Sequence, residues 1–308
     1  LSLLISYHHY FVALIEGKDL EFEISTPKSC PHGFILIGGE CLLIDNLIHA
    51  NYSEAGDICQ IFDSYLVDLT DANLLAAIVQ YITLHDMTGD SYWTGARSVT
   101  GGTTWQWSFD DSDVRLGTPL WGDRNSNVEQ DPSQSLQHCG TLRYNRNFYL
   151  HNYGCTNLFS PICHYQEYAA LKTRTPKVEC EFPYAAIGGR CLLVDHLTFD
   201  TWSNTKLLCE DFHGTIAKID DANLLGDIAQ YINEMGFSQN SYWIGAHQET
   251  HGDPWMWADG SNVTMGTPYW GDDSDEQQYP LDDSLKCAIL DEGEYYFFVN
   301  KDCNANYG

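Results

Sequence analysis

The sequence predicts an α+β fold that is built twice, in two domains of similar size. The segment Ser91–Ala96 (Ser-Tyr-Trp-Thr-Gly-Ala) returns 150 residues later as Ser241–Ala246, with one substitution. In each copy, helical periodicity gives way to short Trp-rich segments that are typical of strands. The cysteines repeat with nearly the same spacing. Because 308 residues exceed what one compact core usually serves, we expect two domains, each able to fold alone.

The first copy begins with a hairpin and a helix. Cys30 and Cys41 flank an apolar run and a Gly pair, a pattern typical of a hairpin that a disulfide could bridge. From Ser53 the apolar residues follow the helical period, which predicts that one face of a helix points inward. That face contains Ala55, Ile58, Cys59, Phe62 and Leu66.

A second helix and an aromatic β region follow. Asp71 is expected to begin the helix, where its carboxylate can cap exposed amides. The apolar stripe of this helix contains Leu74, Leu75, Ile78, Tyr81 and Ile82. Beyond residue 90 the remaining half reads as strands and loops, with tryptophans at 93, 105, 107 and 121 and cysteines at 139, 155 and 163.

The second copy explains the odd number of cysteines. Cys180, Cys191 and Cys209 lie 150 residues after their counterparts, and Cys287 and Cys303 lie 148 residues after theirs. At that offset the counterpart of Cys163 falls at position 311, three residues past Gly308. We therefore expect the second domain to be truncated at its carboxyl end in this sequence, which leaves one cysteine without its partner.

Charge and cysteine content indicate a secreted protein. The formal net charge of −28 disfavours binding to nucleic acid or to an anionic membrane surface. Eleven cysteines indicate an oxidising compartment, and Asn51 and Asn262 begin glycosylation sequons. We assign residues 1–17 to a signal-peptide remnant, 18–28 to an N-terminal extension, 29–165 and 179–308 to the two domains, and 166–178 to a polar linker. No segment predicts insertion into a membrane.

The pattern resembles tandem C-type lectin-like domains of the long form. The resemblance is carried by the core strands at Trp93 and Trp243, by the Trp-x-Trp strands at 105–107 and 255–257, and by the cysteine spacing. It implies two helices packed on small antiparallel sheets, with a long irregular loop region in each domain. It also implies the disulfides Cys30–Cys41, Cys59–Cys163, Cys139–Cys155, Cys180–Cys191 and Cys287–Cys303, with Cys209 unpaired.

In sugar-binding members of that family, a calcium ion is held by oxygens of a Glu-Pro-Asn-type loop, a Glu before the next Cys and a Trp-Asn-Asp motif. A hard cation needs six to eight oxygen ligands, and sugar hydroxyls complete the shell. The first copy departs from this pattern, and its loop can be aligned on Pro132 or on Trp121. The candidate sugar and calcium residues of domain 1 are Asn125, Asn127, Asp131, Ser133, Gln137, His151 and Asn152.

The second copy is poorer in ligands, because Leu285 stands where the Glu would be. Its candidates are Asp275, Glu276 and Asn300. Calcium is therefore expected in domain 1 if in either, and no other cofactor is predicted. We also find no nucleophile beside a base, so we predict no enzymatic activity.

The resemblance implies a secreted lectin of innate immunity, similar to invertebrate humoral lectins, that recognises glycans on microbial or cell surfaces with weakened or absent calcium dependence. The alternative is a module that binds a protein partner without sugar or calcium. A structural protein associated with matrix or mineral is a third hypothesis, based on the charge of −28.

Overall fold

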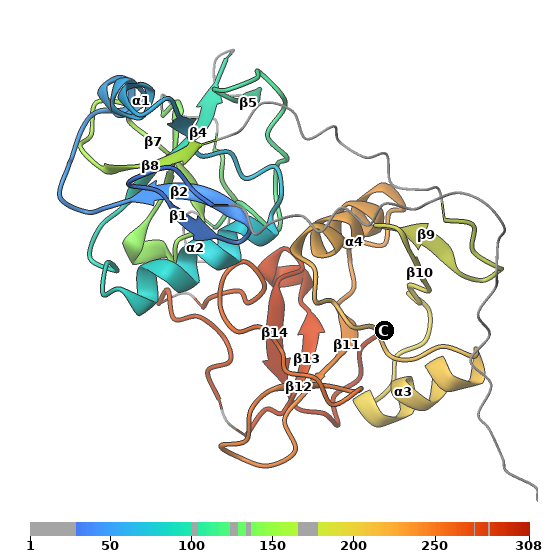
Figure 1. Cartoon of the computed structure of the whole chain (residues 1–308). Helices are drawn as coiled ribbons and strands as arrows, with labels where there is room; N and C mark the ends of the chain where they lie inside the picture. Colours follow the sequence, from blue (N-terminus) through green and yellow to red (C-terminus); the bar gives the residue numbers. More distant parts are fainter. Residues whose placement is uncertain are drawn as a thin grey trace, which may run out of the picture.

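The computed structural model describes residues 29–99, 104–123, 129–133, 137–165, 178–273, 275–282 and 284–308. The expected signal-peptide remnant, the N-terminal extension and nearly all of the linker lie outside these residues. Figure 1 shows two domains side by side, each with two helices and a set of short strands. In the part of the chain that is described, no helix has the length and apolar character needed to cross a membrane.

Domain 1 is built around one eight-stranded sheet, in the order β1-β2-β8-β4-β6-β7, with β3 beside β8 and β5 beside β4. The pairs are antiparallel, except that β8 runs parallel to β4. The last strand therefore lies between the first hairpin and the core strand. The elements are β1 (Ile35–Ile37), β2 (Glu40–Ile44), α1 (Tyr52–Ile61), β3 (Tyr65–Leu66), α2 (Asn73–Leu84), β4 (Tyr92–Ser98), β5 (Trp105–Trp107), β6 (Cys139–Leu142), a 3-10 turn (Tyr144–Arg146), β7 (Leu150–Tyr153) and β8 (Ser160–Tyr165).

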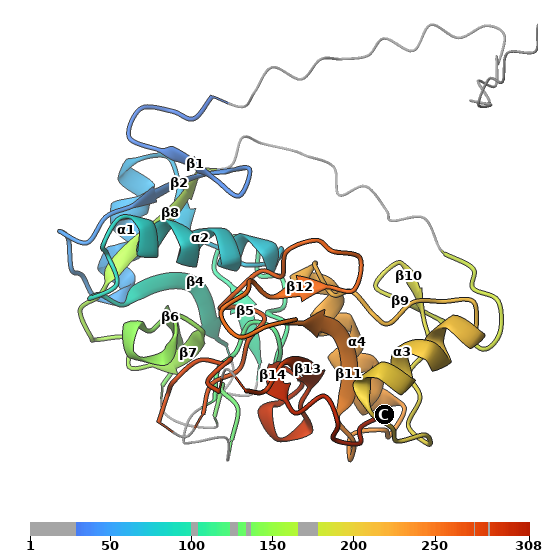
Figure 2. The same cartoon turned by 90° about the horizontal axis from the view of Figure 1, so that it is seen from below.

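Domain 2 repeats this order, but its strands form two separate sheets. One contains β9 and β10, and the other has the order β12-β11-β13-β14. In the described residues no strand joins the two sheets as β8 does in domain 1 (Figure 2). The elements are β9 (Ala185–Ile187), β10 (Arg190–Leu192), α3 (Trp202–Asp211), α4 (Ala222–Glu234), β11 (Tyr242–His247), β12 (Met256–Trp257), β13 (Cys287–Leu290), a 3-10 turn (Glu292–Glu294) and β14 (Phe298–Lys301).

The repeated Trp of the core strand is buried in both domains, as the sequence predicts. Trp93 has no exposed surface, and its Nε1 donates a hydrogen bond of 2.8 Å to the carbonyl of Ala50. Trp243 makes the equivalent bond of 2.8 Å to the carbonyl of Asp200. Each indole thus fills the core while its one polar group is satisfied by backbone. The tryptophan fixes the start of the first helix against the central strand.

The helices follow the predicted stripes with one difference. The stripe of α2 is buried except for the partly exposed Tyr81, and Cys59 of α1 is fully buried. However, α1 ends at Ile61, so Phe62 is 44% exposed and Leu66 lies on β3 instead. The apolar pattern continues past the end of α1 because Leu66 is also buried, although it lies on β3 and not on the helix.

Five disulfides join the cysteines in the pairs that the resemblance implies. They are Cys30–Cys41, Cys59–Cys163, Cys139–Cys155, Cys180–Cys191 and Cys287–Cys303. Cys209 on α3 is a free thiol. Among the described residues, α1 is therefore joined to β8 by a disulfide, whereas α3 has no such bond.

Candidate functional site

The calcium-loop candidates of domain 1 meet where β7 passes the loop at residues 129–133. Asp131, Ser133, His151 and Asn152 are all at most 5% exposed. The residues that the alignment on Pro132 names therefore lie close to one another. Asn125 and Asn127, from the other alignment, lie outside the described residues.

Asp131 does not point into an open cation site, because it is paired with His151. Their Oδ2 and Nδ1 atoms lie 2.8 Å apart, and the two side chains are 5% and 6% exposed. Gly122 makes room for the imidazole, since a Cβ there would lie 2.7 Å from His151 Nε2. The carboxylate that a calcium ion would need is therefore already bound to a ring nitrogen.

Asn152 and Ser133 serve the loop backbone. Asn152 Nδ2 donates to the carbonyls of Ser133 and Gln137, both at 3.3 Å. These bonds hold the loop against β7, and Gln137 takes part through its main chain. Among the described residues, no group of three or more His, Cys, Asp and Glu side chains is arranged to hold a metal ion.

The candidates of domain 2 are separated from one another. Asn300 is 1% exposed, accepts a bond from the Leu281 amide at 3.3 Å, and donates to the Asp282 carbonyl at 2.8 Å. The side-chain amide of Asn300 therefore holds the loop at Leu281 and Asp282 against β14. Asp275 is exposed, whereas Glu276 turns to domain 1 and forms an ion pair with Arg146.

The two domains meet in an interface of approximate two-fold symmetry, which the sequence did not predict. Its first part joins the amino-terminal ends of α2 and α4, which lie at the domain boundary (Figure 1). The Ala72 amide donates to Asn223 Oδ1 at 3.0 Å, and the Ala222 amide donates to Asn73 Oδ1 at 2.9 Å. The exact repeat of Asp-Ala-Asn at residues 71–73 and 221–223 was the signal for this contact, although it also fits a helix cap.

The second part of the interface joins the long-loop regions. Thr118 Oγ1 donates to the Tyr295 carbonyl at 2.6 Å, and Thr267 Oγ1 donates to the Asn147 carbonyl at 2.5 Å. Tyr149 adds a bond of 2.5 Å to the Trp270 carbonyl. The surface that the long-loop region forms on each domain, called here its loop face, therefore packs against the loop face of the other domain.

Buried carboxyl groups give this interface an unusual charge state. Burial, together with Asp123 and Glu276, raises the pKa of Asp272 to about 6, although Asn147 donates to it at 2.7 Å. Burial, with the charges of Asp291, Asp272 and Asp123, raises the pKa of Glu294 to about 8. These surroundings thus favour the protonated form of Glu294 near neutral pH, and that of Asp272 in mild acid.

Comparison with known proteins agrees with the architecture. The Lectin C-type domain family matches residues 48–165 and 198–306. C-type lectin domain family 2 member D-related protein of Rattus norvegicus is 27% identical over 107 residues, which cover 32% of this chain and 43% of the relative. Human C-type lectin domain family 7 member A is 32% identical over 68 residues, which cover 22% of this chain and 27% of that protein. The chain thus spans less than half the length of either relative.

Solved structures with similar folds include TC14, a C-type lectin of the tunicate Polyandrocarpa misakiensis. It is 24% identical with a TM-score of 0.35, covering 41% of this chain and 97% of TC14. The C-type lectin domain of murine dendritic cell inhibitory receptor 2, solved in complex with N-glycan, is 18% identical with a TM-score of 0.36, covering 45% of this chain and 100% of that domain. With the family matching most of the chain in two stretches, the protein belongs to the C-type lectin domain family and contains two such domains.

Proposed function

We propose that the protein is a secreted glycan-recognition protein of innate immunity whose binding does not depend on calcium. The observation that carries this proposal is the buried pair of Asp131 and His151. A calcium ion would have to displace the imidazole and then find further oxygens in loops whose amides hold backbone carbonyls. This arrangement therefore supports glycan binding that does not require calcium.

An aromatic pair on domain 1 offers a surface for such binding. The rings of Tyr65 and Phe109 stack with centroids 3.8 Å apart and an interplanar angle of 20°. Phe109 remains 45% exposed. A stacked, partly exposed ring presents an apolar face on which the C–H face of a sugar ring can pack.

Hydrogen-bonding groups lie beside Tyr65 of this pair. His164 Nδ1 lies 3.3 Å from the Tyr65 hydroxyl and 3.5 Å from Asp68 Oδ2. Its Nε2 atom lies 3.2 Å from Glu40 Oε2. Burial disfavours the charged form of Asp68, but the hydrogen bond and the charge of His164 outweigh it and lower the pKa of that carboxyl. The carboxylates accept hydrogen bonds only, which suits sugar hydroxyls beside an aromatic face.

The test is a glycan array run with calcium and with a chelator, on the unaltered chain and on Phe109→Ala. We expect the same glycans to bind in both conditions and the signal to fall about tenfold or more in Phe109→Ala, because an aromatic ring that the bound sugar covers is worth about 1.4 kcal/mol or more. Phe182→Ala is the matched control, since Phe182 is 98% exposed and should not alter binding. Loss of all binding in chelator would contradict calcium independence, and silence in both conditions would remove the lectin function.

The passage through a secretory pathway is part of the same proposal. Asn262 is exposed, as an acceptor of N-linked glycan must be, and it forms an isolated bridge with Met256 of β12. Asn51 is less open, because its side chain caps α1 by accepting the Glu54 amide at 3.1 Å. After expression in eukaryotic cells, endoglycosidase treatment should lower the mass of the unaltered chain. The same treatment should lower the mass of Asn262→Gln by less.

The protein-binding alternative is favoured by one observation, that the long-loop faces of both domains already bind protein, namely each other. A partner that competes for this face would have to separate the domains. An array of extracellular proteins tests this alternative, and Thr118→Val together with Thr267→Val should increase such binding by opening the interface.

A further inference from the structure

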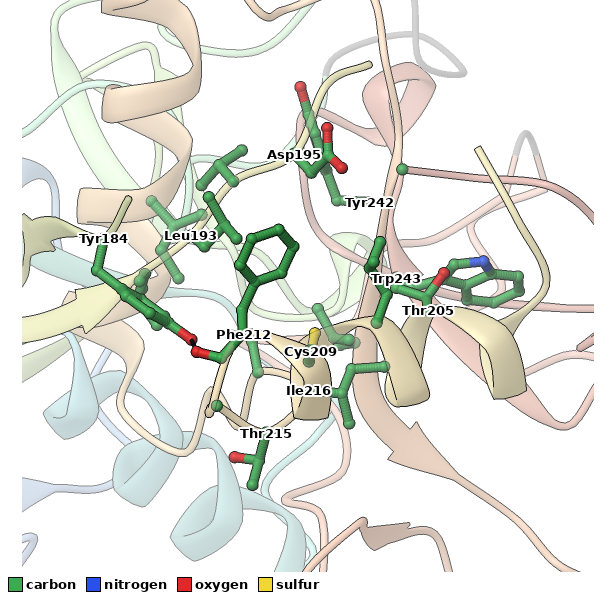
Figure 3. Close-up of a pocket in the computed structure, with 18 of the residues that line it drawn as sticks. Tyr184, Leu193, Asp195, Thr205, Cys209, Phe212, Thr215, Ile216, Tyr242 and Trp243 are labelled. Atoms are coloured by element: carbon green, nitrogen blue, oxygen red, sulfur yellow. Dashed lines mark hydrogen bonds between the residues drawn. The ribbon is translucent and has the colours of Figure 1, made fainter. Parts of the chain in front are cut away.

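Two cavities in the described part of the chain differ in place and in chemistry. One, of about 540 Å³, lies inside domain 2, where Figure 3 shows Leu193, Cys209, Phe212 and Ile216 on its largely apolar walls. The other is a cleft of about 630 Å³ that both domains form. Small-molecule sites typically have volumes of about 300–1,000 Å³. Because charged, amide and hydroxyl groups line this cleft, it is suited to a polar ligand.

The cleft lies between the long-loop region of domain 1 and helix α4 of domain 2. Domain 1 contributes residues 115–118 and Gln130, and domain 2 contributes the C-terminal half of α4 and the turn that begins at Glu292. Thr118 and Tyr295, which are joined across the interface by the bond of 2.6 Å, both line the cleft. A ligand held there therefore contacts both domains.

Arg115 of domain 1 reaches α4, where its charge is neutralised. Its Nη2 atom lies 2.9 Å from Asp227 Oδ1 and donates to Gln230 Oε1 at 3.2 Å. Gly226 makes room for the guanidinium, because a Cβ there would lie 2.8 Å from Arg115 Cζ. A glycine inside a helix is destabilising relative to alanine, and the equivalent residue of domain 1 is Ala76. The contact of Arg115 with α4 is therefore specific to this cleft.

Two other carboxylates of the cleft have no cation beside them. Glu234 Oε1 accepts a hydrogen bond of 2.6 Å from the Gln230 amide, and Glu234 forms no ion pair among the described residues. The Glu292 side chain makes neither a hydrogen bond nor an ion pair with the described residues. Domain 1 has Leu84 and Tyr144 at the equivalent positions. The repeated fold therefore does not require acidic side chains here.

The end of α4 adds negative partial charge at the same place. The carbonyl groups at a helix C-terminus are together equivalent to about half a negative charge, which favours a cation and disfavours a Glu. The last turn of α4 contains no basic residue, and the helix ends on Glu234. The helix end and this carboxylate therefore repel each other unless a positive group lies beside them.

Two tyrosines give the cleft an aromatic wall. Tyr296 is 4% exposed, and its hydroxyl is buried without a hydrogen-bond partner in the described structure. Burial, followed by Tyr242 and the charge of Glu292, raises the pKa of this hydroxyl. Tyr295 is partly buried and also lines the cleft. An ammonium group beside Glu292 can therefore be attracted to the aromatic faces.

We propose that this cleft binds an organic cation that carries a primary ammonium group. The ammonium lies at the end of α4, where Glu234 and Glu292 accept its hydrogen bonds, and its alkyl chain packs on the tyrosines. An anion is disfavoured, because Asp227 neutralises Arg115 and the formal net charge of the chain is −28. An uncharged ligand leaves the repulsion at the helix end in place. This site is separate from the Tyr65–Phe109 surface and does not depend on glycan binding.

The test titrates the full chain by isothermal calorimetry, at fixed ionic strength, with two amines. Cadaverine represents a free diamine, and Nα-acetyl-lysine methylamide presents the same group as a protein partner would. We expect at least one of them to bind, and Glu234→Gln and Glu292→Gln each to weaken its affinity about threefold or more. The bound amine should also raise the thermal unfolding midpoint of the unaltered chain, because it binds only the folded state.

The matched control is Glu210→Gln, which removes an exposed carboxylate from the last turn of α3, outside the cleft. It should leave the affinity for the amine unchanged. Equal weakening by Glu210→Gln would overturn the proposal, because the amine would then respond to the overall charge of the chain. So would the absence of binding by both amines, or tighter binding of 1,5-pentanediol or glutarate, which have the same five-carbon chain without the ammonium groups.

Discussion

At the scale of single residues, the pair of Asp131 and His151 decides what the loop of domain 1 can do. Asp131→Ala removes the partner of His151 Nδ1, and because the His151 side chain is only 6% exposed, water cannot readily replace the lost hydrogen bond. We expect a loss of about 1–3 kcal/mol in the free energy of unfolding of domain 1, measured by urea denaturation followed through Trp fluorescence. Asp275→Ala, at an exposed position, should change it by less than about 0.5 kcal/mol.

If Asp131→Ala instead leaves stability unchanged but abolishes glycan binding in calcium, then Asp131 is a ligand and not a structural partner. The sequence supplied the right residues for this loop and left their roles open. The missing information was the position of His151, which depends on the space above Gly122 and therefore on contacts far apart in sequence.

At the scale of elements, the matched helix ends show how two copies of one motif can bind each other. Asn73 accepts from the Ala222 amide at 2.9 Å and donates to Asp221 at 3.1 Å. Asn73→Ala should therefore cost about 1–3 kcal/mol, because it leaves the Ala222 amide without its acceptor and removes one of the hydrogen bonds to the Asp221 carboxylate. Thermal unfolding measures the loss, and Asn233→Ala at an exposed position of α4 is the control. An unchanged midpoint for Asn73→Ala would mean that water replaces these bonds.

The elements also show how far a sequence can be interpreted. The repeat and the cysteine spacing predict the order of helices and strands, because apolar periodicity and cysteine positions depend on the local sequence alone. The end of α1 was missed, since Leu66 on β3 continues its apolar pattern. The interface was missed as well, because Asn73 fits a local role at a helix start as readily as a contact with a residue 150 positions away.

At the scale of the whole molecule, the packing of the loop faces against each other limits the avidity that two domains on one chain can give. Two sites on one chain raise avidity only if both can reach the same surface. Here Thr118 and Thr267 hold the long-loop regions against the opposite domain. Any gain in avidity must therefore come from outward surfaces such as the Tyr65–Phe109 pair, or from separation of the domains.

Separation of the domains should respond to pH through Glu294. Its pKa is raised from 4.5 to about 8 in the folded chain, mainly by burial and then by Asp291 and Asp272. Below pH 4.5 both folded and unfolded states hold the proton, so this carboxyl does not reduce stability. As pH rises to about 8 the unfolded state releases the proton first, so stability falls across this window and is constant above it. Glu294→Gln removes this dependence and should stabilise the chain at pH 8 by about 1–3 kcal/mol after allowance for solvent screening, with little change at pH 4.5.

The measurement is thermal unfolding of both chains from pH 4.5 to 8.5, and the informative quantity is the difference between them. Glu292→Gln is the matched control, because Glu292 is an exposed residue of the same turn and its pH profile should follow the unaltered chain. A difference that stays flat with pH would mean that Glu294 ionises at the same pH in the folded and the unfolded chain, which would contradict the prediction. A difference that grows with pH would instead make the folded chain most stable in mild acid, where Glu294 beside the contact between the loop faces keeps its proton.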